Sequence, residues 1–360
     1  MFIINDTKLK EFVIDVFIQM GCPKDDALLA ADVLLAADLR GIDSHGVARL
    51  TGYVRLWEAG RINPTPNWKI TYQTPSTATI DADAGLGLVV APKAMQVAIE
   101  KAENVGSGWI SVKNSNHFGI AGYHSMLAAE KDMIGWAMTN ASPLVAPTHS
   151  KERMLGTNPI AIAIPAGEEN DFVADFATTT VANGKLEILQ RKNETAPQGW
   201  VQDKNGNTTN NAAALKDGGA LLPLGSDPLR SNHKGYCLGS AVDILSAVLS
   251  GAGYGPWAPP FVSFLPVPSD PVGQGLGHFL GAMRVDGFRP KEEFKSHMDN
   301  WIRRFKNATP IDESQKVIIP GEPELENVAY RLQNGIPILE PVVKDLEEVA
   351  KKLKLNKLKF

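Results

Sequence analysis

Residues 78–112 read ATIDADAGLGLVVAPKAMQVAIEKAENVGSGWISV, and the order of patterns in this stretch decides the fold class. A short strand pattern at 78–81 is followed by the turn Gly85–Gly87, and a helical pattern then runs from Val90 to Val105. A second strand pattern, rich in β-branched and aromatic residues, follows at 109–112. This succession of strand, helix and strand predicts an α/β core, in which helices pack on a sheet.

The same mixture continues after this stretch, whereas both ends of the chain have a helical pattern. We expect strands at 134–139, 160–164, 172–175 and 278–285, helices at 121–130 and 236–250, and a hairpin at 200–206. Helices are expected near the ends at 7–20, 24–39, 291–306 and 341–355. Pro64, Pro66 and Pro75 break regular structure between the two patterns. We therefore predict an α/β domain at 76–285 and a helical layer formed by residues 1–75 together with 286–360.

The composition is that of an ordinary soluble protein, with 44% hydrophobic and 21% charged residues in a chain of 360. A net charge of −4 without long runs of like charge gives no reason to expect a nucleic-acid partner. Two cysteines, Cys22 and Cys237, are too few for a disulfide framework and favour a reducing, cytoplasmic setting. The most apolar stretch, Leu238–Gly253, contains Asp243 and is shorter than the roughly 20 residues of a membrane span, so we predict no membrane segment.

The segment RGIDSHGVAR at 40–49 holds side chains suited to a small carboxylic acid. Arg49 can bind a carboxylate through two parallel hydrogen bonds, and His45 titrates near neutral pH beside the hydroxyl of Ser44. If a helix begins at Ser44, His45 and Arg49 lie on one face at i and i+4. The alternative is a capped helix start, in which Asp43 or Ser44 is the N-cap and Arg49 is solvated.

A second histidine, His117, lies in the segment Asn114–Gly119 between a predicted strand and a predicted helix. Side chains at strand ends often take part in binding and catalysis in α/β proteins, and the neighbouring amides can orient an imidazole ring. The alternative is an asparagine-rich turn in which His117 caps the next helix. The two histidine segments together favour a general acid/base site, with His117 as the first candidate and His45 as its close rival.

No Gly-x-Gly-x-x-Gly turn and no Walker lysine motif occur in the sequence, so a Rossmann cofactor site is disfavoured. Lys234, at a predicted helix start, could hold a phosphate or could be an exposed lysine. Asp175 ends a predicted strand and could orient an imidazole, accept a ribose hydroxyl or cap a helix that begins near Val181. The histidines lack the spacing of a zinc site, so no metal is expected.

Five motifs, in order along the chain, resemble the malate/L-lactate dehydrogenase family that lacks a Rossmann fold. These motifs are RGIDSHG at 40–46, NSNHFG at 114–119, GTNP at 156–159, DFA at 175–177 and HKGY at 233–236. The resemblance extends from about Leu9 to Glu322. Ureidoglycolate and sulfolactate dehydrogenases, 2,3-diketogulonate reductase and cyclic imino acid reductases are similar.

The resemblance implies an NAD- or NADP-dependent oxidoreductase with a non-Rossmann cofactor-binding sheet, assembled as a homodimer with active sites near the subunit interface. It implies active-site roles for His45 and His117, and substrate contacts for Ser44 and Arg49. It also implies cofactor contacts for Asp175, Phe176, Ala177, Lys234, Gly321 and Glu322. The sequence departs from the family at 148–151, at Cys237 and at 258–277, and these differences leave the substrate open.

The reaction predicted on this basis interconverts a small 2-hydroxy acid and its 2-oxo acid, with a histidine handling the hydroxyl proton. One alternative on the same scaffold is the reduction of a cyclic imino acid or of diketogulonate. A second alternative is a protein that is not an enzyme and binds an acid without catalysing a reaction. Protection from heat unfolding by NADH or NADPH would argue against that binding protein.

Overall fold

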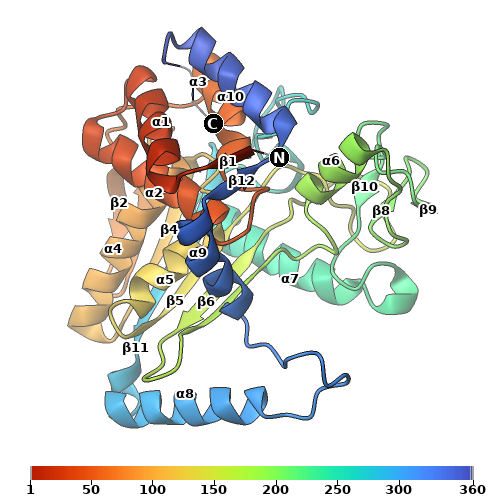
Figure 1. The fold of residues 1–360 in the computed structure, drawn as a ribbon. Coiled ribbons are helices and arrows are strands. Elements are labelled where there is room, and N and C mark those ends of the chain that lie inside the picture. Colours follow the sequence, from red (N-terminus) through yellow and green to blue (C-terminus); the bar gives the residue numbers. More distant parts are fainter. Residues whose placement is uncertain (1, 357, 359–360) are drawn as a thin grey trace.

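The computed structural model describes residues 2–356 and 358, and its centre is a mixed seven-stranded sheet (Figure 1). The strand order is β2, β3, β4, β11, β5, β6, β7, with bounds Lys69–Gln73, Thr77–Asp81, Ser107–Ser115, Leu276–Arg284, Met133–Thr139, Ile160–Ile164 and Phe172–Phe176. β3 and β4 pair in parallel, and the other neighbours pair antiparallel. As a consequence β4, β5 and β7 run in the same direction, so the residues that follow them emerge at the same end of the sheet.

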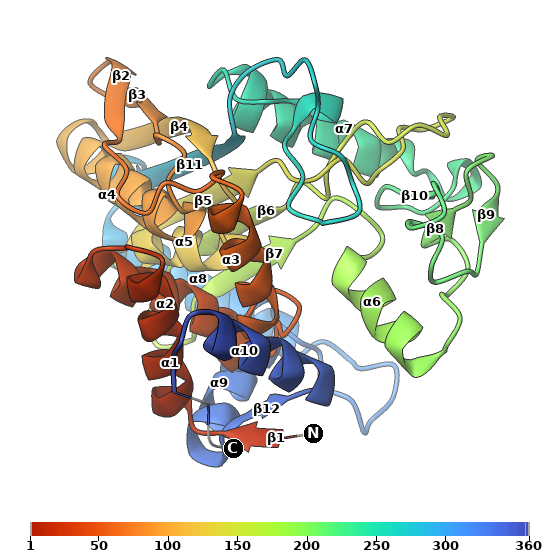
Figure 2. The same ribbon diagram turned by 90° about the horizontal axis from the view of Figure 1, so that it is seen from above.

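Helices cover both faces of this sheet (Figure 1 and Figure 2). Helices α4 (Gly87–Val105) and α5 (Ala121–Ala129) pack on one face, and α7 (His233–Asp243) packs on the other. Neighbouring strand residues show the alternation, because Ala137 joins the core under α4 and α5 while Met138 joins the core under α7. The α/β core predicted from the sequence is confirmed.

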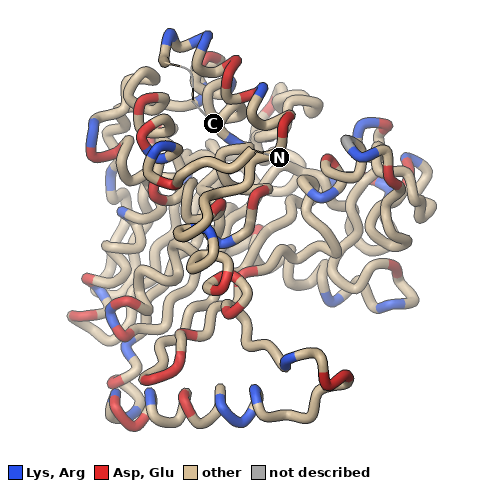
Figure 3. Tube along the Cα trace, in the orientation of Figure 1, with Lys and Arg blue, Asp and Glu red and all other residues tan. Residues whose placement is uncertain are grey.

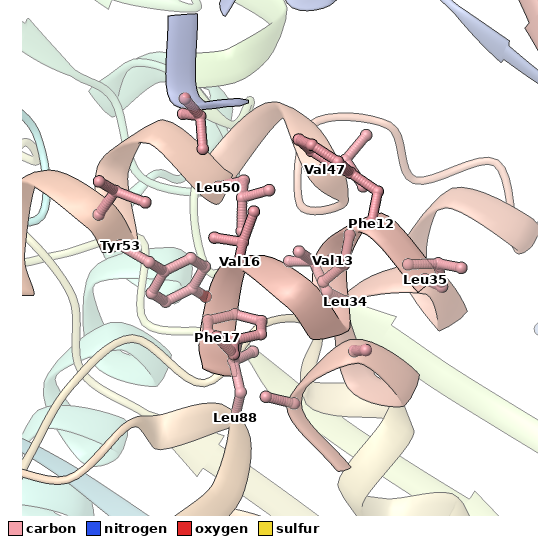
Figure 4. Packing of buried hydrophobic residues seen from close by; sticks show 14 of the residues in the cluster. Phe12, Val13, Val16, Phe17, Leu34, Leu35, Val47, Leu50, Tyr53 and Leu88 are labelled. Atoms are coloured by element: carbon pink, nitrogen blue, oxygen red, sulfur yellow. The ribbon is translucent and has the colours of Figure 1, made fainter. Parts of the chain in front are cut away.

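The two ends of the chain pack together beside the sheet in what we call the terminal layer (Figure 2). It contains α1, α2, α3, α10 and the antiparallel pair β1 and β12, with bounds Asp6–Gln19, Lys24–Leu39, Leu50–Glu58, Glu340–Lys352, Phe2–Ile4 and Ile336–Ile338. Its apolar core joins Phe17 of α1 to Leu34 of α2 and Tyr53 of α3 (Figure 4). Leu88 of α4 belongs to the same core, so the layer is fixed against the sheet. The predicted packing of the two chain ends is confirmed for these elements, whereas the helix predicted at 291–306 lies outside the layer and residues 69–73 belong to the main sheet.

Helix α8 (Lys291–Lys306) lies along the lower edge of the sheet, away from the terminal layer (Figure 1). Lys291 Nζ pairs with Asp132 at 2.9 Å, and the Asp299 carboxylate accepts three backbone N–H groups from the loop between β6 and β7. Charged residues of both signs follow one another along α8 (Figure 3). The division of the chain into two domains stays a prediction.

Several elements differ from the sequence-based expectation. Strand β2 and helices α3 and α9 (Glu322–Asn334) were not predicted, and α7 continues as a π-helix at Ile244–Val248. Helix α6 (Asn183–Lys192) precedes a small sheet of β8, β9 and β10, at Val201–Gln202, Thr208–Thr209 and Ala220–Leu221, which contains the predicted hairpin. In the described part of the chain, none of the helices combines the length and the apolar character that crossing a membrane requires.

Candidate active site

Two histidines from distant parts of the sequence lie beside each other at one end of the sheet. The ring centroids of His45 and His117 are 5.8 Å apart, and the ring planes differ by 22°. His117 follows β4, while His45 lies in a turn of the terminal layer. A flat group between two rings needs a gap of about 7 Å, twice the usual carbon–carbon contact distance. A flat ligand group therefore cannot insert between the two rings.

A buried tyrosine holds the ring of His117. Tyr53 Oη lies 2.6 Å from His117 Nδ1, and the Gly119 N–H donates to the same nitrogen at 3.3 Å. Tyr53 is fully buried on α3, where its ring packs edge-on against Phe17 (Figure 4). These contacts direct Nδ1 into the protein and, among the described residues, leave Nε2 available to a ligand.

The asparagines that flank His117 do not orient its ring, contrary to the expectation from the sequence. Asn116 Nδ2 donates to backbone oxygens of the turn before α4, and Asn114 Nδ2 donates to a strand carboxylate at 3.0 Å. Both side chains therefore fix the backbone around His117. The orienting group is Tyr53, which sequence reasoning missed. Its spacing of four residues after Arg49 was the available signal, since i and i+4 residues share a helix face.

Ser44, His45 and Arg49 are joined by hydrogen bonds within one turn. Ser44 Oγ lies 2.9 Å from His45 Nδ1, and Arg49 Nε donates to the Ser44 carbonyl oxygen at 2.5 Å. The outer end of the guanidinium faces α6, where Arg49 Nη2 lies 3.6 Å from Glu187 Oε2. The turn therefore presents a hydroxyl, an imidazole and a cation together.

The backbone of this turn differs from the predicted helix. Residues 43–46 form a turn, and a 3-10 helix, Val47–Arg49, precedes α3. The capped-helix alternative is also wrong, because Gly46 precedes the 3-10 helix without a side-chain cap and Arg49 is largely buried beside Glu187. Asp43 forms an ion pair with Arg331 of α9. The i and i+4 relation of an α-helix therefore does not describe this segment.

A buried carboxylate fixes the shape of the turn. Asp38 is 1% exposed, and its Oδ2 accepts the Val47 N–H at 2.8 Å. Gly46 leaves the space for this carboxylate, since a Cβ at that position would lie 1.9 Å from Asp38 Oδ1. Burial raises the pKa of Asp38 to about 8, against the opposing effect of the Val47 N–H.

A cavity of about 350 Å³ opens beside the turn. It lies between the terminal layer and α6, and its lining includes Ser44, Arg49, Glu187, Lys192, Arg331 and Ile338. An acid in this cavity meets Ser44 and Arg49, while neither histidine belongs to the lining. His45 is joined to the lining through its hydrogen bond with Ser44. The four predicted substrate and acid/base residues are thus brought together, although their roles stay predictions.

Burial lowers the pKa of both histidines. The pKa of His45 falls to about 4, and the neighbouring Arg49 charge acts in the same direction as burial. The pKa of His117 falls well below its usual range, because burial, His45 and Arg49 all disfavour a second positive charge. Both rings are therefore neutral near pH 7, which is the form that accepts a proton.

A second cavity, of about 400 Å³, lies at the end of β7. Its lining includes Arg40, Gly122, Asp175, Phe176, Ile318, Pro320, Gly321 and Glu324. Asp175 Oδ2 accepts the Gly122 N–H at 2.7 Å, so it caps α5 and not the predicted helix near Val181. Burial of its carboxyl group raises the pKa of Asp175 to about 6, and Glu324 acts in the same direction, while the Gly122 N–H and Arg40 lower it.

The remaining predicted cofactor residues lie outside these two cavities. Lys234 is exposed in the first turn of α7, and Ala177 is half-buried after β7. Glu322 accepts the Ile319 N–H at 2.9 Å and pairs with Lys306 at 2.6 Å. Their cofactor roles stay predictions. Across residues 2–356 and 358, His, Cys, Asp and Glu side chains form no group of three or more that could hold a metal ion.

Known proteins match this chain along nearly its whole length. The model of the family "Malate/L-lactate dehydrogenase" matches residues 4–347. A malate dehydrogenase from Pyrococcus abyssi is 44% identical over 347 residues, which cover 96% of this chain and 93% of that protein. An L-sulfolactate dehydrogenase from Methanocaldococcus jannaschii is 42% identical over 348 residues, which cover 96% of each. The solved structure of malate dehydrogenase from Pyrococcus horikoshii OT3 superposes with a TM-score of 0.89 at 40% identity, covering 99% of this chain and 97% of that one.

Proposed function

Since the chain belongs to the malate/L-lactate dehydrogenase family, we propose that it interconverts a 2-hydroxy acid and the matching 2-oxo acid at the His45 and His117 pair. Membership over nearly the whole chain makes the protein a hydroxy acid dehydrogenase. The observation that supports the finer proposal is the position of a fixed, neutral imidazole close to the Arg49 guanidinium. The two relatives of this chain described above are named for malate and sulfolactate. Oxaloacetate and sulfopyruvate, the matching oxo acids, are therefore the first substrates to test.

In this proposal Arg49 binds the substrate carboxylate and His117 handles the proton. The Arg49 Nε is engaged by the Ser44 oxygen, so the two Nη atoms face the carboxylate. The base is the tautomer with the proton on His117 Nδ1, which donates to Tyr53 Oη at 2.6 Å and gives up the longer hydrogen bond from the Gly119 N–H. In this tautomer the lone pair on Nε2 accepts the proton of the substrate hydroxyl. In the reverse direction the same Nε2–H donates its proton to the new alkoxide oxygen. His45 is the alternative acid/base.

The residues of the second cavity suit a nicotinamide dinucleotide. Asp175 offers a carboxylate that can accept ribose hydroxyls, and Phe176 and Gly321 provide apolar and backbone surface. The resemblance adds Ala177, Lys234 and Glu322 to this set. A bound nicotinamide would supply the hydride acceptor or donor, and either NAD or NADP is compatible with the proposal. We also propose a homodimer, as the family resemblance implies.

The test is oxidation of NADH and NADPH with oxaloacetate, pyruvate, sulfopyruvate, diketogulonate and cyclic imino acids. Turnover of a 2-oxo acid supports the proposal, and activity confined to a cyclic imine or to diketogulonate would transfer the same residues to the alternative reaction. If neither cofactor reacts or protects the protein from heat, the proposal fails in favour of an acid-binding protein.

Variants of the two histidines then separate their roles. His117→Asn should lower kcat by about 10²- to 10⁴-fold while NADH binding is retained. His45→Asn is the matched comparison, since it changes the neighbouring ring alone. Full activity in both variants would overturn the assignment of an acid/base histidine.

A further inference from the structure

An aromatic side chain from a distant loop packs on the histidine that we propose as the base. Phe261 is 9% exposed, and its ring centroid lies 4.8 Å from that of His117 and 5.2 Å from that of Tyr53. The ring also lies against the backbone of α3, because a Cβ at Gly52 would be only 2.4 Å from Phe261 Cζ. Phe261 therefore contacts the base, the tyrosine that orients it and the helix that carries the tyrosine.

The backbone around Phe261 is held by three polar side chains. Its N–H donates to Ser142 Oγ at 2.8 Å, and its carbonyl oxygen accepts a hydrogen bond from Arg55 Nη2. Arg61 Nη1 donates to the carbonyl oxygen of Pro260 at 2.9 Å. Loop residues fixed by several side chains form a defined surface rather than a mobile tip. The ring of Phe261 is thus a fixed wall of the site.

The other side of this wall is a small cavity that also reaches the carboxylate anchor. The cavity has a volume of about 190 Å³, and its lining includes Ala48, Arg49, Thr51, Arg55, Phe261 and Phe264. Arg49 and Phe261 therefore border the same space, while Phe261 also touches His117. Phe261 thus lies next to both groups that the proposed function assigns to the acid.

We propose that Phe261 determines substrate specificity by limiting the group attached to the reacting carbon of the acid. This inference rests on the proposed function, because it assumes that the acid bridges Arg49 and His117. The accepted class is short 2-oxo and 2-hydroxy acids, whose substituent is a methyl group or an unbranched methylene arm. Branched or aryl substituents would overlap the ring of Phe261. Phe261 lies in the segment 258–277, where the sequence is expected to depart from the family pattern.

The first test compares pyruvate with 3-methyl-2-oxobutanoate, which differs in two added methyl groups. The wild type should have a higher kcat/KM for pyruvate than for 3-methyl-2-oxobutanoate. Phe261→Ala should lower the ratio of these two values at least about tenfold, because each added carbon in a fitted pocket changes kcat/KM by about 10- to 200-fold. Phe261→Leu keeps an apolar side chain in case the alanine variant folds poorly. Leu265→Ala is the matched control, because it trims the same loop outside the Arg49 cavity. An unchanged preference in both Phe261 variants, or an equal change in the control, would overturn the proposal.

A binding test separates this inference from the proposed reaction. Oxamate and N-isobutyl oxamate are unreactive acids of small and large size, and their affinities can be measured by calorimetry on protein with and without NADH. The wild type should bind oxamate more tightly, and the Phe261 variants should narrow the difference at least about tenfold. If no 2-oxo acid is reduced but the Phe261 variants still narrow the affinity difference between the two oxamates, the proposed function fails. The role of Phe261 in limiting the size of a bound acid then stands. If 2-oxo acids are reduced but the affinity difference between the two oxamates is the same in the wild type and the Phe261 variants, only the role of Phe261 fails.

Discussion

Replacing Arg49 by methionine should raise KM for the 2-oxo acid far more than it lowers kcat. In the free protein Arg49 Nε donates to the Ser44 oxygen at 2.5 Å, and Nη2 lies 3.6 Å from Glu187. Methionine retains much of the apolar stem but has no donor. Because a carboxylate anchor acts in the ground state and in the transition state alike, its loss appears mainly in KM.

The magnitude follows from the donors that remain for the substrate. Each hydrogen bond to a charged group contributes about 1.5–3 kcal/mol, so two bonds from the Nη atoms contribute roughly 3–6 kcal/mol. Release of the Glu187 ion pair, whose partners are partly exposed, offsets up to about 1 kcal/mol of this loss. A remainder of about 2–6 kcal/mol corresponds to a kcat/KM lower by roughly 30-fold to 10⁴-fold.

Steady-state kinetics with the substrate found in the panel measures this loss, and NADH fluorescence checks that cofactor binding is retained. Arg49→Lys should fall between wild type and Arg49→Met, since a lysine offers a charge without the planar pair of donors. Arg284→Met is the matched control, because Arg284 forms an ion pair with Asp286 at the surface. A decrease of less than about fivefold in kcat/KM for Arg49→Met would refute the reasoning and place the carboxylate elsewhere.

Three further outcomes are expected. Gly46→Ala should lower the free energy of unfolding by about 1–3 kcal/mol, because its Cβ would lie 1.9 Å from the buried Asp38 carboxylate; an unchanged midpoint in urea would contradict this. Glu187→Gln should lower KM by about two- to fivefold, since it removes the charge that competes for Arg49, and steady-state kinetics that give a higher KM would show that Glu187 assists binding. NADH binding should tighten as pH rises through about 6, because Asp175 ionises there and becomes a better acceptor. Fluorescence titrations should show that Asp175→Asn loses this pH dependence, and an equal dependence in both proteins would exclude Asp175 as its source.

The local parts of the site could be predicted from the sequence, because their residues are neighbours in the chain. Ser44, His45 and Arg49 come from one segment, so their types alone indicated an acid-binding turn. The partners supplied by packing could not be predicted. Glu187 reaches Arg49 only because α6 lies beside the turn, and no periodicity specifies that position. Tyr53 has a helical spacing from Arg49, but its contact with His117, from a distant segment, is made by packing.

The fold shows the same division between local and distant information. The succession of strands and helices between residues 77 and 176 was predicted from the spacing of apolar residues, and the α/β core follows from it. The order of the strands in the sheet was not predicted. Strand β11 enters between β4 and β5 from a distant part of the sequence, and it pairs antiparallel with both. This insertion leaves β4, β5 and β7 running in one direction, which brings His117 and Asp175 to the same end of the sheet.

The charges of the site couple proton transfer to substrate binding in the proposed reaction. Burial keeps His45 and His117 neutral, and the positive charge of Arg49 acts in the same direction. A carboxylate bound to Arg49 offsets that charge, so His117 becomes a stronger base when the hydroxy acid is in place. The oxo acid keeps its carboxylate, so the protonated ring remains stabilised until the product leaves. When the product leaves, the charge of Arg49 is no longer offset and again disfavours the protonated ring, so His117 loses its proton. The residue that anchors the substrate therefore also restores the base.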